Sequence, residues 1–193
     1  FGIANMADSL YAIRKLVYEE KKVTMEEMKE ALAWNYGKGI DAQSAADITT
    51  IVMQKLQENG ISVNEQTATA VMTAALGTEP SPEKKARFEE IHKMIEEVPK
   101  FGNDIPDVDY FARDVAYTYT RPLQKYMNPR GGHYQAGLYP VSANVPLGGQ
   151  TGATPDGRYA HTPVADGVSP SAGKDVKGPT AAATSVSRLD HFI

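Results

Sequence analysis

Apolar residues recur every three or four positions through the first half of the chain, which is the period of an amphipathic helix. The first stripe predicts a helix that begins after Asp8 and Ser9 and runs to about Glu20. Thr24 and Glu27 form a capping box, which predicts a second short helix, because each side chain can bind the backbone N–H of the other residue. Further stripes predict helices within about 48–60, 71–77, 82–98 and 108–122.

Composition changes near residue 98. Residues 1–98 contain two Pro and five Gly, whereas the remainder contains ten Pro and eleven Gly. We therefore divide the chain into 1–98, a helical segment with an elongated connection, and 99–193, a loop-rich segment. In the second segment the runs 137–145 and 163–168 favour strands, and 180–185 favours the start of a helix. Long ordered loops are commonly functional, so the second segment is where a site is expected.

Length and charge narrow the class of protein. The chain has 193 residues, 41% of them hydrophobic and 23% charged, which is ordinary globular composition. A net charge of −4 provides no basic field for a phosphate backbone, so nucleic-acid binding is not expected. No apolar run is long enough to span a bilayer, and no signal peptide is recognisable, so no membrane partner is expected. The first residue is Phe1 and the last is apolar, from which we expect a fragment of a longer protein.

Cysteine is absent, which excludes disulfides, thiol nucleophiles and Cys-ligated metal sites from these residues. This fits a reducing compartment, and the cytoplasm is the default expectation. The four histidines are scattered without metal-ligand spacing, so no metal site is predicted. His92 lies beside the apolar stripe of its helix and is expected to be a surface or boundary residue. The glycine-rich runs 148–152 and 167–175 match neither a dinucleotide fingerprint nor a P-loop. These residues alone indicate a soluble α/β fragment.

Short motifs rich in Gly, Pro and Asp follow one another in a fixed order, mostly in the second half. They are Asn5-Met6-Ala7-Asp8-Ser9-Leu10, Pro99-Lys100-Phe101-Gly102-Asn103-Asp104, Arg130-Gly131-Gly132, Gly137-Leu138-Tyr139-Pro140-Val141-Ser142-Ala143-Asn144-Val145-Pro146, Thr151-Gly152-Ala153-Thr154-Pro155-Asp156-Gly157-Arg158, Ala165-Asp166-Gly167-Val168-Ser169-Pro170 and Gly178-Pro179-Thr180-Ala181. The series resembles the glycyl radical enzymes, the pyruvate formate-lyase-like superfamily, and within it the dehydratase-type members that act on glycerol, propanediol or hydroxyproline. The resemblance covers about 1–36 and 95–193, whereas 37–94 carries no motif of that family.

This resemblance implies an α/β fold in which the chain is part of a ten-stranded glycyl radical enzyme barrel, with helices outside and the active site inside. In that family a glycyl radical takes hydrogen from a cysteine, and the resulting thiyl radical abstracts hydrogen from the substrate. The motifs that carry the cysteine, its neighbouring carboxylate and the radical glycine are not in these residues, so no catalytic residue is expected here. No bound cofactor is implied. A radical S-adenosylmethionine activating enzyme, which installs the radical, is the implied protein partner, and the oligomeric state stays open with a homodimer as one candidate.

Within this chain the resemblance implies two residues that bind a small-molecule substrate. Tyr139 would donate a hydrogen bond to a substrate hydroxyl or carboxylate, and Val141 would form an apolar wall. A buried tyrosine with a satisfied hydroxyl is an equally good interpretation of Tyr139. Asp156, Arg158 and Asp166 stand in turn contexts, where Asp caps the turn and the following Gly takes positive φ, so structural roles are expected.

The resemblance therefore implies that the parent protein is an enzyme, a glycyl radical dehydratase that eliminates water from a small hydroxylated substrate. A glycyl radical C–C or C–heteroatom lyase, such as formate acetyltransferase or choline lyase, is one alternative. The other is a non-catalytic barrel remnant that acts in binding or assembly.

Overall fold

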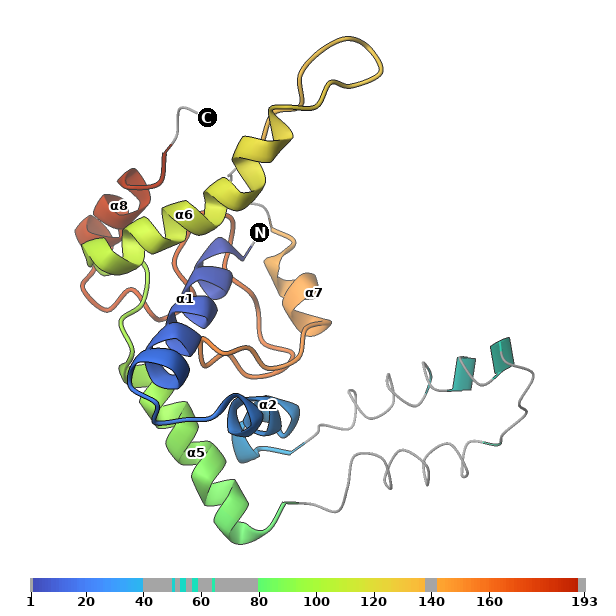
Figure 1. The fold of residues 1–193 in the computed structure, drawn as a ribbon, viewed down its shortest axis with the longest axis vertical. Coiled ribbons are helices and arrows are strands. Elements are labelled where there is room, and N and C mark those ends of the chain that lie inside the picture. Colours follow the sequence, from blue (N-terminus) through green and yellow to red (C-terminus); the bar gives the residue numbers. More distant parts are fainter. Residues whose placement is uncertain are drawn as a thin grey trace.

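The computed structural model describes residues 2–39, 80–137 and 142–190, with isolated positions at 50, 53–54, 57–58 and 64. Figure 1 shows these residues as helices joined by long loops. In chain order the elements are α1 (Ile3–Ile13) with a π-helical continuation (Arg14–Glu19), α2 (Met25–Ala33), a 3-10 turn (Asn35–Gly37), α5 (Pro82–Glu97), α6 (Pro106–Leu123), α7 (Asn144–Gly149) and α8 (Pro179–Ser187).

Capping chemistry starts two of these helices where the sequence predicts. The Oγ1 atom of Thr24 accepts from the Glu27 N–H at 3.1 Å, and Oε2 of Glu27 accepts from the Thr24 N–H at 2.8 Å, so the capping box of α2 is confirmed. Ser81 accepts from the Lys84 N–H at 3.3 Å, and Pro82 then opens α5. The helices expected within 48–60 and 71–77 lie largely outside the described residues.

The start of α1 differs from the prediction. We expect a helix after Asp8, but α1 begins at Ile3. The expectation is wrong because the Asp8 side chain does not cap its own helix: its Oδ1 atom accepts from the Phe101 N–H at 2.8 Å. The predicted end near Glu20 is confirmed, since helical turns continue as the π-helical segment to Glu19.

No strand forms within the described residues, so neither run that favoured a strand is confirmed. Residues 163–168 form extended loop and turn, and the N–H of Val164 donates to the Asn144 carbonyl at 3.2 Å instead of joining a ladder. Of the run 137–145, residues 138–141 lie outside the described part, and the run ends in a turn and the start of α7. The described residues therefore show the helices and loops of the expected α/β class but none of its strands. The helix expected from 180–185 is confirmed as α8.

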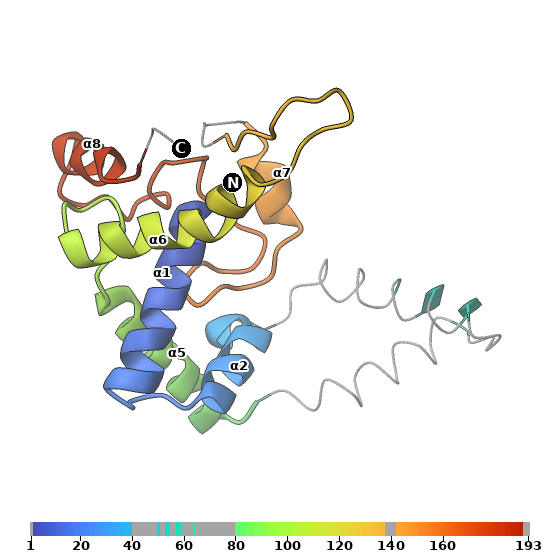
Figure 2. The same ribbon diagram turned by 45° about the horizontal axis from the view of Figure 1, so that its top comes forward.

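One hydrophobic core draws side chains from both sides of residue 98. In Figures 1 and 2, α1 lies against α6, while α5 packs on α2 and the 3-10 turn. The Tyr11 ring meets the Phe111 ring edge-on, with centroids 5.7 Å apart. Large buried members of the core include Tyr11, Leu16, Met28, Tyr36, Phe88, Ile91, Ile95, Phe101, Val108 and Leu189. Of the helices described, none has the length and apolar character to cross a membrane.

A buried polar contact holds α8 to α6. The hydroxyl of Ser185 donates to Oδ2 of Asp109 at 2.9 Å and accepts from the Asp104 N–H at 2.9 Å. Arg188 Nη1 donates to the same Asp109 oxygen at 2.5 Å. Because Asp109 and Ser185 are both fully buried, these contacts fix α8 against α6 without access of solvent.

Candidate functional site

Tyr139 and Val141, the two residues assigned to the substrate by resemblance, lie outside the described residues. Their assignment stays a prediction. The structure describes α7, which begins three residues after Val141, and the loop 151–164 beside it. The candidate site is therefore built from α7, this loop and the helices α1 and α5 that hold the loop.

The helix α7 rests backbone against backbone on the loop. A glycine at 148 permits this approach, because a Cβ there would stand 2.3 Å from the Thr162 carbonyl oxygen. The N–H of Val164 donates to the Asn144 carbonyl at 3.2 Å, and the N–H of His161 donates to the Thr151 carbonyl at 3.0 Å. Any side chain larger than hydrogen at Gly148 would therefore separate α7 from its support.

The loop turns sharply over Pro155-Asp156-Gly157-Arg158, as turn chemistry predicts. The N–H of Gly157 donates to the Thr154 carbonyl at 3.1 Å, and Gly157 has a φ of 94°, which glycine adopts without strain. Asp156 Oδ1 accepts from Thr154 Oγ1 at 2.5 Å and from the Arg158 N–H at 3.3 Å. The turn-capping role expected of Asp156 is confirmed.

The guanidinium of Arg158 binds backbone carbonyls. Nη1 donates to the carbonyls of Tyr159 at 3.1 Å and Thr162 at 2.6 Å, and Nη2 donates to those of Thr151 at 3.3 Å and Gly152. The side chain is 8% exposed, and burial lowers the pKa of the guanidinium below its usual value. Arg158 thus links residues 151–152 to Tyr159 and Thr162 of the same loop, and its expected structural role is confirmed.

On α1, Asn5 joins three parts of the returning loops. Its Nδ2 donates to Asp156 Oδ2 at 2.6 Å and to Ser171 Oγ at 3.1 Å, and its Oδ1 accepts from the Ala165 N–H at 2.5 Å. All three partners stand more than 150 positions away in the chain. Because a contact of this range leaves no local pattern, sequence reasoning does not single out Asn5.

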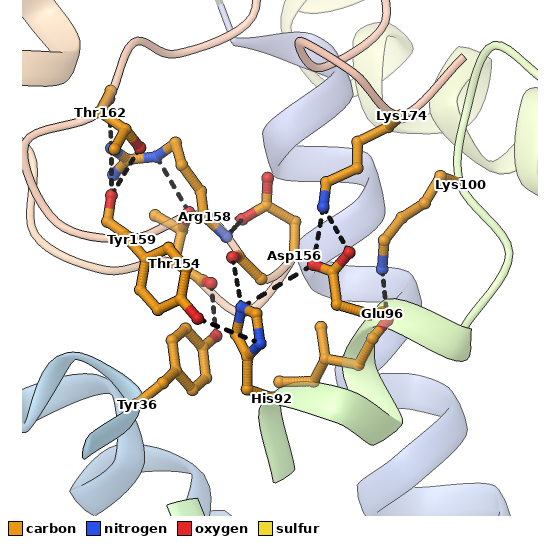
Figure 3. A network of polar contacts seen from close by, with 12 residues as sticks. Tyr36, His92, Glu96, Lys100, Thr154, Asp156, Arg158, Tyr159, Thr162 and Lys174 are labelled. Carbon is orange, nitrogen blue, oxygen red and sulfur yellow. Dashed lines mark hydrogen bonds and ion pairs between the residues drawn. The ribbon is translucent and has the colours of Figure 1, made fainter. Parts of the chain in front are cut away.

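A cavity of about 310 Å³ opens beside this network, between α1, α5 and the loops. Its lining includes Asn5, His92, Glu96, Asp156, Arg158, Ser171 and Lys174. Figure 3 shows Lys174 reaching toward Glu96, and its Nζ donates to the two carboxylate oxygens at 2.7 and 2.5 Å. A cavity of this size has room for one small molecule.

Three aromatic rings stand together beside the turn (Figure 3). The His92 ring stacks on the Tyr159 ring with centroids 4.6 Å apart, and Tyr36 meets the His92 ring edge-on at 4.7 Å. His92 Nε2 lies 2.9 Å from the Gly157 carbonyl oxygen, which can only accept, so we assign the ring proton to Nε2. The Tyr36 hydroxyl donates to the Thr154 carbonyl at 2.6 Å, and burial raises the pKa of Tyr36 above its usual value. His92, whose side chain is 17% exposed, occupies the expected boundary position.

Two buried ionisable groups lie at the base of the network. Asp8 is fully buried, and its Oδ2 has no hydrogen-bond partner in the described part of the chain. Burial raises the pKa of Asp8 to about 7, while the Phe101 N–H and the charge of Lys100 oppose that rise. Lys100 is also buried, with Nζ donating to the Ile95 carbonyl at 2.6 Å, and burial lowers its pKa. Burial therefore disfavours the charged form of both groups.

These contacts describe a support rather than a reacting centre. Within the ranges that the structure describes, no group of three or more His, Cys, Asp or Glu side chains is placed to hold a metal ion. The polar groups around the turn mostly bind one another, so the arrangement holds a loop and α7 in a fixed position. Sequence reasoning finds Asp156 and Arg158 through turn chemistry. It misses Asn5 and Lys100, although both lie inside motifs that carry the resemblance.

Comparison with curated proteins and protein families gives a consistent result. A family model described as pyruvate formate lyase-like matches residues 1–148. A probable dehydratase of Escherichia coli K12, YbiW, is 34% identical over 194 residues, which cover 97% of this chain and 18% of that protein. The chain therefore spans about a fifth of the length of the relatives it matches.

Two solved structures are also similar along nearly the whole chain. One, from work on 1,2-propanediol dehydration in Roseburia inulinivorans, is 60% identical with a TM-score of 0.87, and the match covers 99% of this chain and 23% of that chain. The other is the glycerol-bound form of the B12-independent glycerol dehydratase from Clostridium butyricum. It is 42% identical with a TM-score of 0.70, and the match covers 100% of this chain and 18% of that chain.

Proposed function

We propose, because this chain belongs to the pyruvate formate lyase-like family, that the whole protein is a glycyl radical dehydratase that removes water from a small vicinal diol. The family membership expected from the ordered motifs is confirmed by the match over residues 1–148. The activity rests on one observation above all, the 60% identity over 99% of this chain to the structure from work on 1,2-propanediol dehydration. Among glycerol, propanediol and hydroxyproline, propanediol is therefore the first substrate to test.

In this proposal the chain contributes one part of a ten-stranded barrel, with residues 1–98 on its helical outside and 99–193 leading to the active site. The sequence has no cysteine, so the residue that forms the thiyl radical belongs to another part of the protein. The glycyl radical would supply the initial hydrogen abstraction, which takes hydrogen from that cysteine. A radical S-adenosylmethionine activating enzyme is the proposed partner, the cytoplasm is the proposed location, and a homodimer stays a candidate.

Tyr139 and Val141 are the proposed contacts of this chain with the substrate. The Tyr139 hydroxyl would donate a hydrogen bond to a substrate hydroxyl and fix the orientation of the diol. Val141 would present an apolar wall. This wall would keep bulk water out of the site, although the reaction itself releases a water molecule. Neither residue moves a proton or forms a bond in this proposal.

The activity is tested with the full reading frame that contains this chain, activated without dioxygen by its activating enzyme. The glycyl radical is first counted by electron paramagnetic resonance. The protein is then given 1,2-propanediol, glycerol or trans-4-hydroxyproline, and the carbonyl or imine product is measured. Conversion of 1,2-propanediol to propanal and water is the expected result. A full radical signal with no dehydration of any of the three would reject the proposal, and C–C or C–heteroatom cleavage of another substrate would assign a lyase instead.

The role of Tyr139 is tested by Tyr139→Phe in the same protein, with Tyr126→Phe as the matched control, because Tyr126 is 63% exposed. Loss of a hydrogen bond to the substrate should raise KM by about tenfold. The control should leave KM unchanged. An unchanged KM in Tyr139→Phe would favour the alternative interpretation, a buried tyrosine that serves only packing.

A further inference from the structure

The carbonyl of Thr162 is held from two sides. Arg158 Nη1 donates to its oxygen at 2.6 Å. From the other side, Gly148 of α7 lies so close to the same oxygen that a Cβ would stand 2.3 Å from it. Gly148 is buried, whereas the Thr162 side chain is exposed, so the fixed part of Thr162 is its backbone. The position of α7 therefore depends on a carbonyl that Arg158 holds.

Arg158 also binds the chain where it leaves α7. The helix ends at Gly149, and Nη2 of Arg158 donates to the carbonyls of Thr151 and Gly152 immediately after it. One planar group thus joins the exit of α7 to the segment on which α7 rests. His161 adds a contact of the same kind, since its Nδ1 lies 2.5 Å from the Gly149 carbonyl oxygen.

The turn that carries Arg158 is itself fixed on two helices. Asn5 of α1 donates to Asp156 at 2.6 Å, and His92 of α5 donates to the Gly157 carbonyl at 2.9 Å. Figure 3 shows the Arg158 side chain extending from this turn toward Thr162, on the far side from α5. Arg158 therefore connects α7 to the helical core through this turn.

We propose that Arg158 is a positioning residue of the dehydratase, which sets the position of α7, the helix that follows the proposed substrate contacts in the sequence. The inference rests on the proposed function, which assigns Tyr139 and Val141 to the substrate. Arginine suits this task because its planar fork offers five donors at fixed angles. A lysine offers a single ammonium nitrogen on a flexible stem, which does not reproduce the spread, planar fork that reaches the carbonyls of Tyr159, Thr162, Thr151 and Gly152.

The experiment uses the full protein, activated to equal radical content, and compares Arg158→Lys with Arg113→Lys. Arg113 lies on α6 and pairs with Asp114 at 3.0 Å, so it controls for the loss of a guanidinium. Hydrogen exchange is measured for peptides covering 144–152 and for peptides of α5. Arg158→Lys should speed exchange in 144–152 and leave α5 unchanged. KM for 1,2-propanediol should rise about tenfold, with kcat changed less than about threefold, because the substrate contacts are misplaced and the radical chemistry is intact.

A second pair of variants disturbs the same contact from the helix side. Gly148→Ala should raise KM in the same way, whereas Gly149→Ala is its control, because a Cβ at 149 meets nothing within 4 Å. Faster exchange in 144–152 with wild-type KM in both Arg158→Lys and Gly148→Ala would overturn the positioning role, as would unchanged exchange in Arg158→Lys. Absence of diol dehydration by the activated wild-type protein would overturn the proposed function instead, and the exchange data would still report whether Arg158 holds α7.

Discussion

Asn5 on α1 donates from Nδ2 to Oδ2 of Asp156 at 2.6 Å, across 151 positions of the chain. The acceptor belongs to the turn that carries Arg158, so this contact ties the loop beside α7 to the first helix. Both side chains are almost fully buried, at 7% and 2% exposed. A buried carboxylate depends strongly on such a donor, because water cannot replace it.

Substitution of Asn5 by Ala should therefore destabilise the protein. The change removes a donor from Asp156 and the acceptor of the buried Ala165 N–H. Each buried group left without that partner costs about 1–3 kcal/mol. The midpoint of urea unfolding should fall with an unchanged slope, while Lys29→Ala, at an exposed position of α2, should shift it little. Equal midpoints for the two variants would show that Asn5 does not anchor the turn.

Helices whose signals are local could be predicted from the sequence. The capping box at Thr24 and the Ser81-Pro82 start need only neighbouring residues, and both appear where expected. The start of α1 could not be predicted, because Asp8 resembles a cap in sequence but binds Phe101, 93 positions away. The short α7 could not be predicted either, because six residues with two glycines give no helical period.

For the candidate site, too, the sequence predicts the local contacts but not the long-range ones. Turn chemistry indicates the roles of Asp156 and Arg158, since the signal lies within the turn itself. Which carbonyls Arg158 binds depends on where Thr162 and Gly152 come to lie, and no spacing rule supplies that. The role of Asn5 could not be predicted either, because all its partners are distant in sequence. The assignment of Tyr139 stays a prediction.

Gly157 and Gly173 form a natural comparison. Both have left-handed φ values, 94° and 75°, so alanine is strained at either position by about 1–2 kcal/mol. A Cβ at 173 meets nothing within 4 Å, whereas a Cβ at 157 would stand 2.3 Å from Glu96 Oε1, an atom that Lys174 holds. Gly157→Ala should therefore lower the melting temperature more than Gly173→Ala. Adding Glu96→Ala to Gly157→Ala should recover most of that difference, and equal melting temperatures for the two single variants would contradict the contact.

The attachment of α8 is tested by two serines of that helix. Ser185 is fully buried and both donates to Asp109 and accepts from the Asp104 N–H, whereas the exposed Ser187 binds only the Thr184 carbonyl in these contacts. Ser185→Ala should cost about 1–3 kcal/mol, since it removes one of the two donors to Asp109 Oδ2 and the acceptor of the Asp104 N–H. Ser187→Ala should be nearly neutral. Proteolysis of the α8 region under native conditions provides the measurement, and similar cleavage rates in both variants would count against the tether.

The buried Asp8 makes stability depend on pH in a defined direction. Its pKa is raised from 3.8 to about 7, chiefly by burial, so the native protein keeps a proton that the unfolded chain releases. The contribution of Asp8 to stability is therefore full below about pH 4 and is lost as pH rises to about 7. A shift of this size corresponds to about 4 kcal/mol.

Asp8→Asn should remove that dependence. The amide is neutral at every pH and keeps an oxygen for the Phe101 N–H, which the Asp8 carboxylate binds at 2.8 Å. Above pH 7 the variant should be more stable than the wild type, because it carries no charge into a fully buried site, and the advantage should shrink toward pH 4. The measurement is the urea midpoint of both proteins from pH 4.5 to 8, with the exposed Asp114→Asn as control. Parallel curves for Asp8→Asn and the wild type would show that Asp8 is ionised in the native protein throughout this range.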